Sequence, residues 1–169
     1  MIKFREYKEE DAKTILSFIP DAESFYKWSA TALGTYPLST LAFINRINEM
    51  KSTKVFYPYV MIDDDKVIGF FILRYWDPNI NSLTIGFVVI DPTYRGKGIG
   101  KKMVSEAINL AFNHYKADSC NLRVFDCNPS AYNCYKSVGF KENGITKTYE
   151  MNNKLWKVIE LELNNDNKI

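Results

Sequence analysis

The chain has 169 residues, with 22 lysines and arginines against 20 aspartates and glutamates, for a formal net charge of +2. This length predicts one folded domain with a single core, and the near balance of charge argues against nucleic acid or an anionic membrane as the main partner, so any anion must be bound locally. Residues 1–13 contain no apolar signal core, and the longest apolar runs, such as 68–73, are far shorter than a membrane span. We therefore expect a cytoplasmic protein.

Residues 1–50 predict a strand followed by two helices. Residues 2–7 alternate as a strand, and apolar residues recur with helical spacing over 10–19. Four aromatic residues come next: Phe25, Tyr26, Trp28 and Tyr36. Ser39 is then placed as the N-cap of a second helix that runs to about Met50.

The middle of the chain changes to the period of strands. Residues 54–63 and 66–76 predict two antiparallel strands around a DDDK turn, and 82–90 predicts a further buried strand. Asp91-Pro92 ends that strand, since proline cannot donate to a ladder. A helix is expected from Gly98 to about His114, so it begins inside a glycine-rich loop.

The last third predicts one more helix and three strands. The elements, in chain order, are a strand over 120–126, a short helix over 130–137, and strands over 145–151 and 155–163 joined by a turn at 152–154. Asn128 and Pro129 are placed at the N-cap and first position of that helix, and Gly139 at its C-terminal cap. Together the elements predict an α/β fold, a mixed sheet with helices on its faces.

Cysteine and histidine are too few and too poorly spaced to predict a metal site. Cys120, Cys127 and Cys134 lie seven residues apart and form no C-x-x-C pair, so we expect reduced thiols and no metal. His114 is the only histidine, and a Ser-His-Asp triad is possible only through it. Because it falls in the tail of a predicted helix, we interpret it as a helix-terminal residue.

The stretch DPTYRGKGIGKKM, residues 91–103, joins a strand to a helix N-terminus through three glycines, and this arrangement predicts an anion site. The triphosphate-loop pattern fails, because it needs glycine where Arg95 stands and serine or threonine where Lys102 stands. The dinucleotide fingerprint fails at Lys101, which stands where the third glycine is needed. The pattern that remains is R-x-x-G-x-G, from Arg95 to Gly100.

Two segments of the chain resemble the GNAT superfamily of N-acetyltransferases. The first is the R-x-x-G-x-G loop, preceded by VVIDPTY and followed by a helix, and the second is NPSAYNCYKSVGF over 128–140. The resemblance implies an α/β (α+β) fold with a mixed, largely antiparallel sheet of about seven strands and about four helices. We expect this single domain to span residues 1–163, with a polar tail at 164–169 that frays.

The resemblance also implies a cosubstrate, acetyl-CoA, and the residues that bind it. Main-chain groups of the strand before the loop hold the pantetheine arm and polarise the thioester; the matching residues are Val88, Val89 and Ile90. The loop takes the diphosphate with Arg95, Gly96, Lys97, Gly98, Ile99, Gly100 and Lys101. Asn128 is both a helix cap and a cofactor contact. Tyr135 occupies the position that donates a proton or hydrogen bond to the departing CoA sulfur, although core packing is its alternative.

The general base and the acceptor site are less well marked. The positions at which GNAT members carry a catalytic glutamate are matched here by Thr84 and Arg123, neither of which can act as a base. Asp126, a water chain, or loss of the proton before binding remain as alternatives. The aromatic residues of 25–36 could surround an amine by cation–π contact or could serve as lid or core packing.

The predicted activity is transfer of the acetyl group of acetyl-CoA to a primary amine of a small molecule or peptide, by direct attack in a ternary complex. A non-catalytic CoA-binding sensor is the main alternative, motivated by the missing glutamates. A nucleotide-binding loop is a third hypothesis, which predicts stronger stabilisation by ATP than by CoA. Neither nucleic acid nor membrane is an expected partner.

Overall fold

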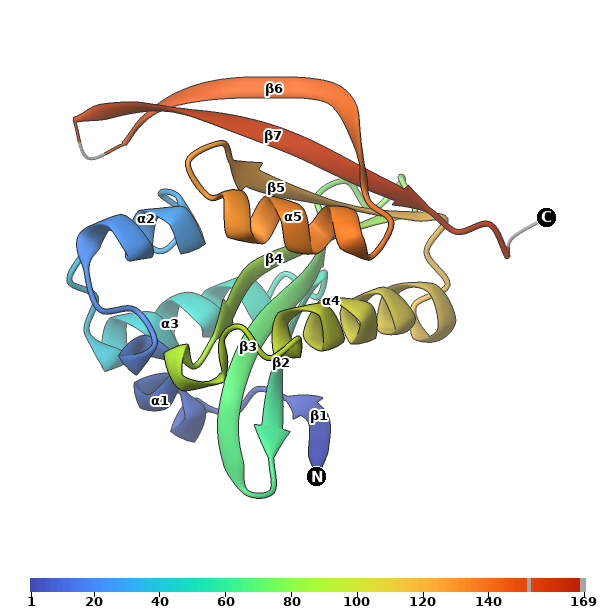
Figure 1. Cartoon of the computed structure of the whole chain (residues 1–169). Coiled ribbons are helices and arrows are strands. Elements are labelled where there is room, and N and C mark those ends of the chain that lie inside the picture. The colour runs from blue at the N-terminus through green and yellow to red at the C-terminus, as the bar shows by residue number, and fades with distance from the viewer. Residues whose placement is uncertain (152, 168–169) are drawn as a thin grey trace.

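The computed structural model describes residues 1–151 and 153–167, and its centre is one seven-stranded sheet in the order β1-β2-β3-β4-β5-β7-β6 (Figure 1). The strands are β1 (Ile2–Glu6), β2 (Phe56–Asp63), β3 (Lys66–Tyr75), β4 (Ser82–Ile90), β5 (Ser119–Phe125), β6 (Lys141–Met151) and β7 (Lys154–Asn164). Every neighbouring pair is antiparallel except β4 and β5. The predicted mixed, largely antiparallel sheet is therefore confirmed.

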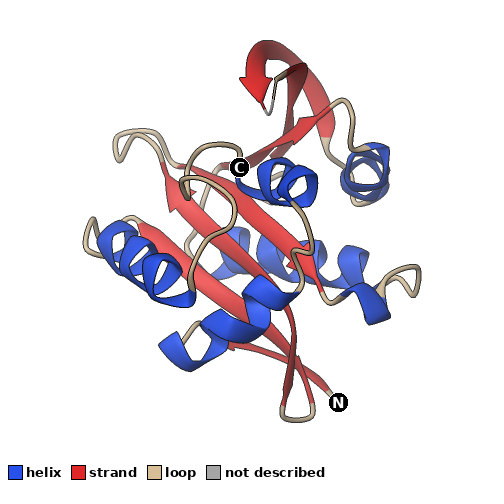
Figure 2. Ribbon diagram, turned by 90° about the vertical axis from the view of Figure 1, so that its left-hand side faces the viewer, coloured by secondary structure: helices blue, strands red, loops and turns tan. Residues whose placement is uncertain are grey.

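Helices cover both faces of this sheet (Figure 2). They are α1 (Ala12–Ser17), α2 (Ala22–Ser29), α3 (Thr40–Lys51), α4 (Ile99–Asn109) and α5 (Pro129–Ser137). Buried residues of α4 and α5 pack with one face of the strands, and buried residues of α1, α2 and α3 pack with the other. β3 contributes to both clusters, which explains why its apolar run is continuous rather than alternating. None of the helices in the described residues is long and apolar enough to cross a membrane.

Two details differ from the sequence prediction, and a third is not tested. The aromatic-rich segment contains the helix α2, whose N-cap Asp21 accepts a hydrogen bond from the Ser24 amide at 2.7 Å. The predicted helix over 98–114 ends as a regular α-helix at Asn109 and continues as a π-helical turn. The turn predicted at 152–154 includes Asn152, which lies outside the described residues.

The predicted fraying of the polar tail is wrong at its first two residues. Asn164 is the last residue of β7. Asn165 is buried, and its side-chain Nδ2 donates to the Ala117 carbonyl at 3.0 Å. Its backbone N–H donates to the Asp118 carbonyl at 2.8 Å. These contacts fasten the end of β7 to the loop before β5. Residues 168 and 169 of the tail lie outside the described residues.

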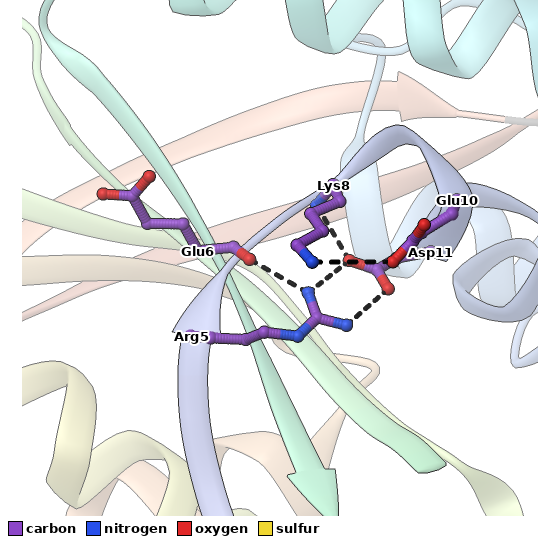
Figure 3. A network of polar contacts seen from close by, with 5 residues as sticks. All are labelled: Arg5, Glu6, Lys8, Glu10 and Asp11. Carbon is purple, nitrogen blue, oxygen red and sulfur yellow. Dashed lines mark hydrogen bonds and ion pairs between the residues drawn. The ribbon is translucent and has the colours of Figure 1, made fainter. Parts of the chain in front are cut away.

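A buried carboxylate connects β1 to the first helical segment (Figure 3). Asp11 is 3% exposed and accepts two hydrogen bonds from the Arg5 guanidinium, at 2.7 and 2.8 Å, and one from the Lys8 amide at 2.8 Å. The Arg5 guanidinium also donates to the Glu6 carbonyl at 3.0 Å. This bidentate pair holds the edge strand against the turn that leads into α1.

Candidate active site

The two parallel strands at the centre of the sheet separate part-way along. β4 and β5 are paired only from Ser82 opposite Ser119 to Thr84 opposite Asn121. Side chains hold the paired part together, since the Thr84 hydroxyl donates to Asn121 Oδ1 at 2.6 Å and Asn121 Nδ2 donates to Ser82 Oγ at 3.0 Å. Beyond this point the strands enclose a cleft of about 430 Å³, lined by residues 85–90 of β4 and by parts of β5, α2, α5 and the glycine loop.

A β-bulge turns the β4 backbone at the cleft. The register against β3 shifts between Phe70 and Ile72, and Phe87 has a φ of +48°. The indole Nε1 of Trp28, on α2, donates to the Phe87 carbonyl at 2.7 Å and so holds the bulge from the helix side. Residues 85–90 keep pairs with β3 on one side of the bulge, but on the side that faces β5 no strand pairs with them within the described residues, and this edge lies along the cleft.

The turn into the glycine loop is built around Asp91. Its carboxylate accepts from the Thr93 amide at 2.9 Å and the Thr93 hydroxyl at 2.8 Å, and lies 2.8 Å from the Lys66 ammonium. Burial alone would raise the pKa of Asp91, but the Lys66 ammonium and the Thr93 donors outweigh it and lower the pKa below its ordinary value. A charged Asp91 therefore fixes the direction in which the chain leaves β4.

The glycines of the loop are of two kinds. Gly96 and Gly98 have φ of +72° and +75°, and no atom lies within 4 Å of a Cβ built on either, so both sit in open space at the start of α4. A Cβ on Gly100 would meet Ile90 Cδ1 at 3.3 Å and Cys134 Sγ at 3.6 Å, so this glycine allows α4 to pack closely. The first two leave backbone N–H groups at a helix N-terminus accessible to an anion.

The structure brings together most, but not all, of the residues predicted for the site. Those that line the cleft are Val88, Val89, Ile90, Arg95, Gly96, Gly100, Asn128 and Tyr135. Those that do not are Lys97, Gly98, Ile99 and Lys101. The Lys97 ammonium instead donates to the Thr93 carbonyl at 3.0 Å, within the loop itself.

Tyr135 lies on α5 and faces the cleft. The helix begins at Asn128, whose side chain accepts from the Ala131 amide at 3.4 Å, and it is closed by Gly139 with a φ of +106°. The Tyr135 ring is 7% exposed and packs edge-on to Phe140, and its hydroxyl has no hydrogen-bond partner in the part of the chain that the structure describes. Burial, with a smaller contribution from Cys134, raises the pKa of Tyr135, so its phenol stays protonated.

The aromatic segment serves mainly as packing. Phe25 is 1% exposed, with its ring centroid 5.3 Å from Tyr26, 6.3 Å from Trp28 and 5.8 Å from Tyr36. Of these four residues only Trp28 lines the cleft. Core and wall packing, rather than an aromatic cage for an amine, is what this geometry supports.

The residues weighed as possible bases do not provide one. Thr84 is hydrogen-bonded to Asn121, Arg123 pairs with Glu160, and Asp126 is exposed and does not line the cleft. Among the lining residues that the structure describes there is no aspartate, glutamate or histidine. Two lining cations, Lys27 and Arg123, were not predicted as site residues, and no local pattern connects positions so far apart in sequence.

Comparison with known proteins decides the family. The acetyltransferase (GNAT) family model matches residues 22–140, which include β4, the glycine loop and α5. The chain belongs to the GNAT family of acetyltransferases. This GNAT protein is an acyl-CoA N-acyltransferase, and acetyl-CoA is its cosubstrate.

Its relatives act on different amines. The GNAT chain is 29% identical over 115 residues to the spermine/spermidine N(1)-acetyltransferase of Bacillus subtilis, covering 59% of this chain and 76% of that protein. It is 26% identical over 149 residues to the peptidyl-lysine N-acetyltransferase YjaB of Salmonella typhimurium, covering 85% and 86%. Its fold is similar to spermidine N-acetyltransferase from Vibrio cholerae, solved with CoA and spermine, with a TM-score of 0.82, 18% identity and coverage of 96% and 95%.

The residues of the GNAT chain fit a CoA thioester. The open space at Gly96 and Gly98 is where side chains would otherwise stand, and it lies at the start of α4, where N–H groups favour a diphosphate. The exposed backbone edge of residues 85–90 offers hydrogen bonds to an amide-containing arm. Gly96 and residues 85–90 line one cleft, which Tyr135 also lines.

Proposed function

We propose that this enzyme moves the acetyl group of acetyl-CoA to a primary amine by direct attack in a ternary complex. The observation that carries this proposal is the single cleft between β4 and β5, which is lined by residues of the glycine loop, by Tyr135 and by residues of α2 and β5. One cleft that reaches both a diphosphate site and an acceptor space favours transfer without a covalent enzyme intermediate.

Cosubstrate binding is assigned mainly to the backbone. The main chain of Val88, Val89 and Ile90 would hold the pantetheine arm and polarise the thioester carbonyl, since its groups lie along the cleft edge. The loop from Arg95 to Lys101 would take the diphosphate on its N–H groups. Arg95 lines the cleft and would add a charge-assisted contact, whereas Lys97 and Lys101 would contribute positive potential from outside it.

The transfer step needs few protein groups to account for its bonds and protons. The amine nitrogen attacks the carbonyl carbon, the C–N bond forms and the C–S bond breaks; the proton lost by nitrogen leaves through water, and the CoA thiolate gains one. Tyr135 Oη would donate a hydrogen bond to the developing charge on sulfur. A complete proton transfer from an ordinary phenol to an ordinary thiolate is uphill by about 1.5 pKa units, and the raised pKa of Tyr135 makes it steeper, so the hydrogen bond is the assigned role.

The proposal is tested by following thiol release from acetyl-CoA with a broad panel of amines. We expect release that depends on the amine, with an acetylated product of matching mass. Tight acetyl-CoA binding without release from any amine would instead support a CoA-binding sensor. Stronger thermal stabilisation by ATP than by CoA would contradict the assignment of the loop.

Trp28→Phe is expected to slow acetyl transfer several-fold, because it removes the hydrogen bond that holds the Phe87 carbonyl while most of the ring packing is kept. The lost bond should cost about 1 kcal/mol of stability, so the protein should remain folded at assay temperature. Steady-state kinetics and thermal unfolding of the two proteins check this.

Trp156→Phe is the matched control. Trp156 lies on β7, is buried against Phe125, and does not line the cleft. It should lose comparable stability with little change in kcat. Equal loss of kcat in both variants would show that Trp28 acts only through general stability.

A further inference from the structure

Among the described residues, every charged side chain that lines the cleft is a cation. Lys27 comes from α2 and Arg123 from β5, the elements that form its walls beyond the β4 edge, whereas Arg95 belongs to the glycine loop. Among the lining residues in the described ranges there is no carboxylate that could neutralise a positively charged ligand. The charged side chains that a ligand would meet on these two walls are therefore those of Lys27 and Arg123.

Both cations are anchored by partners outside the cleft. The Lys27 ammonium lies 2.9 Å from Glu23 Oε1, one helical turn earlier on α2. Arg123 Nε donates to Glu160 Oε2 at 3.2 Å across the β5–β7 ladder, and its guanidinium carbon lies 5.6 Å from the Trp76 ring centroid. Neither glutamate lines the cleft. Each pair fixes one cation and leaves it with further N–H groups for a ligand.

We infer that the acceptor is a small aminocarboxylate, an amine that carries a carboxylate on the same short molecule, and that Lys27 and Arg123 bind this carboxylate. The inference rests on the proposed function, because it concerns the acceptor of that same cleft. A carboxylate would gain charge-assisted hydrogen bonds from the two side chains. The second ammonium of a polyamine would meet two like charges and, among the described lining residues, no carboxylate, because Glu23 and Glu160 lie outside the cleft; this disfavours polyamines even though relatives are named for them.

The substrate preference is measured with pairs of acceptors that differ only in the carboxylate. The ω-aminocarboxylates from β-alanine to 6-aminohexanoate are compared with their carboxamides, and with spermidine, by thiol release. For the best chain length we expect kcat/KM to be about 10- to 100-fold higher for the carboxylate than for its carboxamide. Equal values for each pair at every length, or a preference for spermidine, would overturn the inference while leaving acetyl transfer established.

Substitutions test whether Lys27 and Arg123 cause the preference for the carboxylate over the carboxamide. Lys27→Gln and Arg123→Gln should each reduce the carboxylate-to-carboxamide ratio by about 10-fold, with turnover of the carboxamide retained. Arg123→Lys keeps the charge and should keep part of the ratio. Lys13→Gln removes an exposed lysine of α1 that does not line the cleft, and should leave the ratio unchanged. An unchanged ratio in the double variant Lys27→Gln/Arg123→Gln would refute the assignment.

A binding measurement separates this inference from the proposed function. Calorimetric titration of 6-aminohexanoate and its shorter homologues into the CoA-loaded enzyme needs no turnover. The carboxylate site is supported if at least one of these compounds binds, and if this binding is lost both with the corresponding carboxamide and in the double variant. This holds even if no amine releases CoA, in which case only the proposed transfer fails. Absence of any difference between carboxylate and carboxamide in this titration refutes the site.

Discussion

Tyr135→Phe is expected to lower kcat for acetyl transfer by about 10- to 100-fold and to leave the Kd of acetyl-CoA within about twofold. Tyr135 lines the cleft, and its hydroxyl has no hydrogen-bond partner in the described residues, so its removal should deprive the departing sulfur of a donor and leave the fold's contacts intact. A hydrogen bond to a charged group contributes about 1.5–3 kcal/mol, which corresponds to this range of rates. Single-turnover kinetics and equilibrium binding of acetyl-CoA measure the two quantities separately.

Tyr132→Phe is the matched control on the same helix. The Tyr132 hydroxyl donates to Glu142 Oε1 at 2.5 Å, away from the residues that line the cleft, so this variant should keep the wild-type rate. Because the pKa of Tyr135 is raised, its phenol remains protonated through the neutral range, and the ratio of wild-type to Tyr135→Phe rates should be constant there. A wild-type rate in Tyr135→Phe would remove this residue from the mechanism.

The strands could be predicted from sequence because their apolar patterns and their punctuation agree. The strand predicted over 82–90 has the same first and last residues as β4, and Asp91-Pro92 ends it as expected. The sequence prediction does not include the helix α2 because aromatic residues dominate the segment, although Asp21 followed three residues later by Ser24 is a capping pattern that indicates its start. The local sequence therefore contains a signal for the start of α2.

The shape of the cleft, in contrast, depends on contacts that no local pattern contains. A non-glycine residue with positive φ, Phe87, reads in the sequence as an ordinary strand residue, and its bulge is supported by Trp28 from a helix 59 positions earlier. The same is true of the two cations that line the cleft. Lys27 is on α2 and Arg123 on β5, and only the tertiary fold places both on the cleft. The resemblance to a family could predict the loop and Tyr135, but it did not indicate these two cations as site residues.

Asp11→Ala is expected to lower the free energy of unfolding by about 2–4 kcal/mol, measured by urea denaturation. The substitution leaves the Arg5 guanidinium without its bidentate partner and the Lys8 amide without an acceptor, in a network that connects β1 to the turn before α1 (Figure 3). Removing one member of a buried pair costs about 3–5 kcal/mol, and the 30% exposure of the Arg5 side chain reduces this, because water can solvate the stranded charge.

Asp64→Ala is the control for loss of an acidic residue. Its carboxylate is 2.6 Å from the N-terminal ammonium, but both groups are more than four-fifths exposed, so this variant should lose much less stability than Asp11→Ala. The double variant Arg5→Met/Asp11→Leu removes both charges and fills similar volume, and should recover much of the stability lost in Asp11→Ala. Equal destabilisation by Asp11→Ala and Asp64→Ala would contradict the view that burial is what makes the Arg5–Asp11 pair important for holding the edge strand.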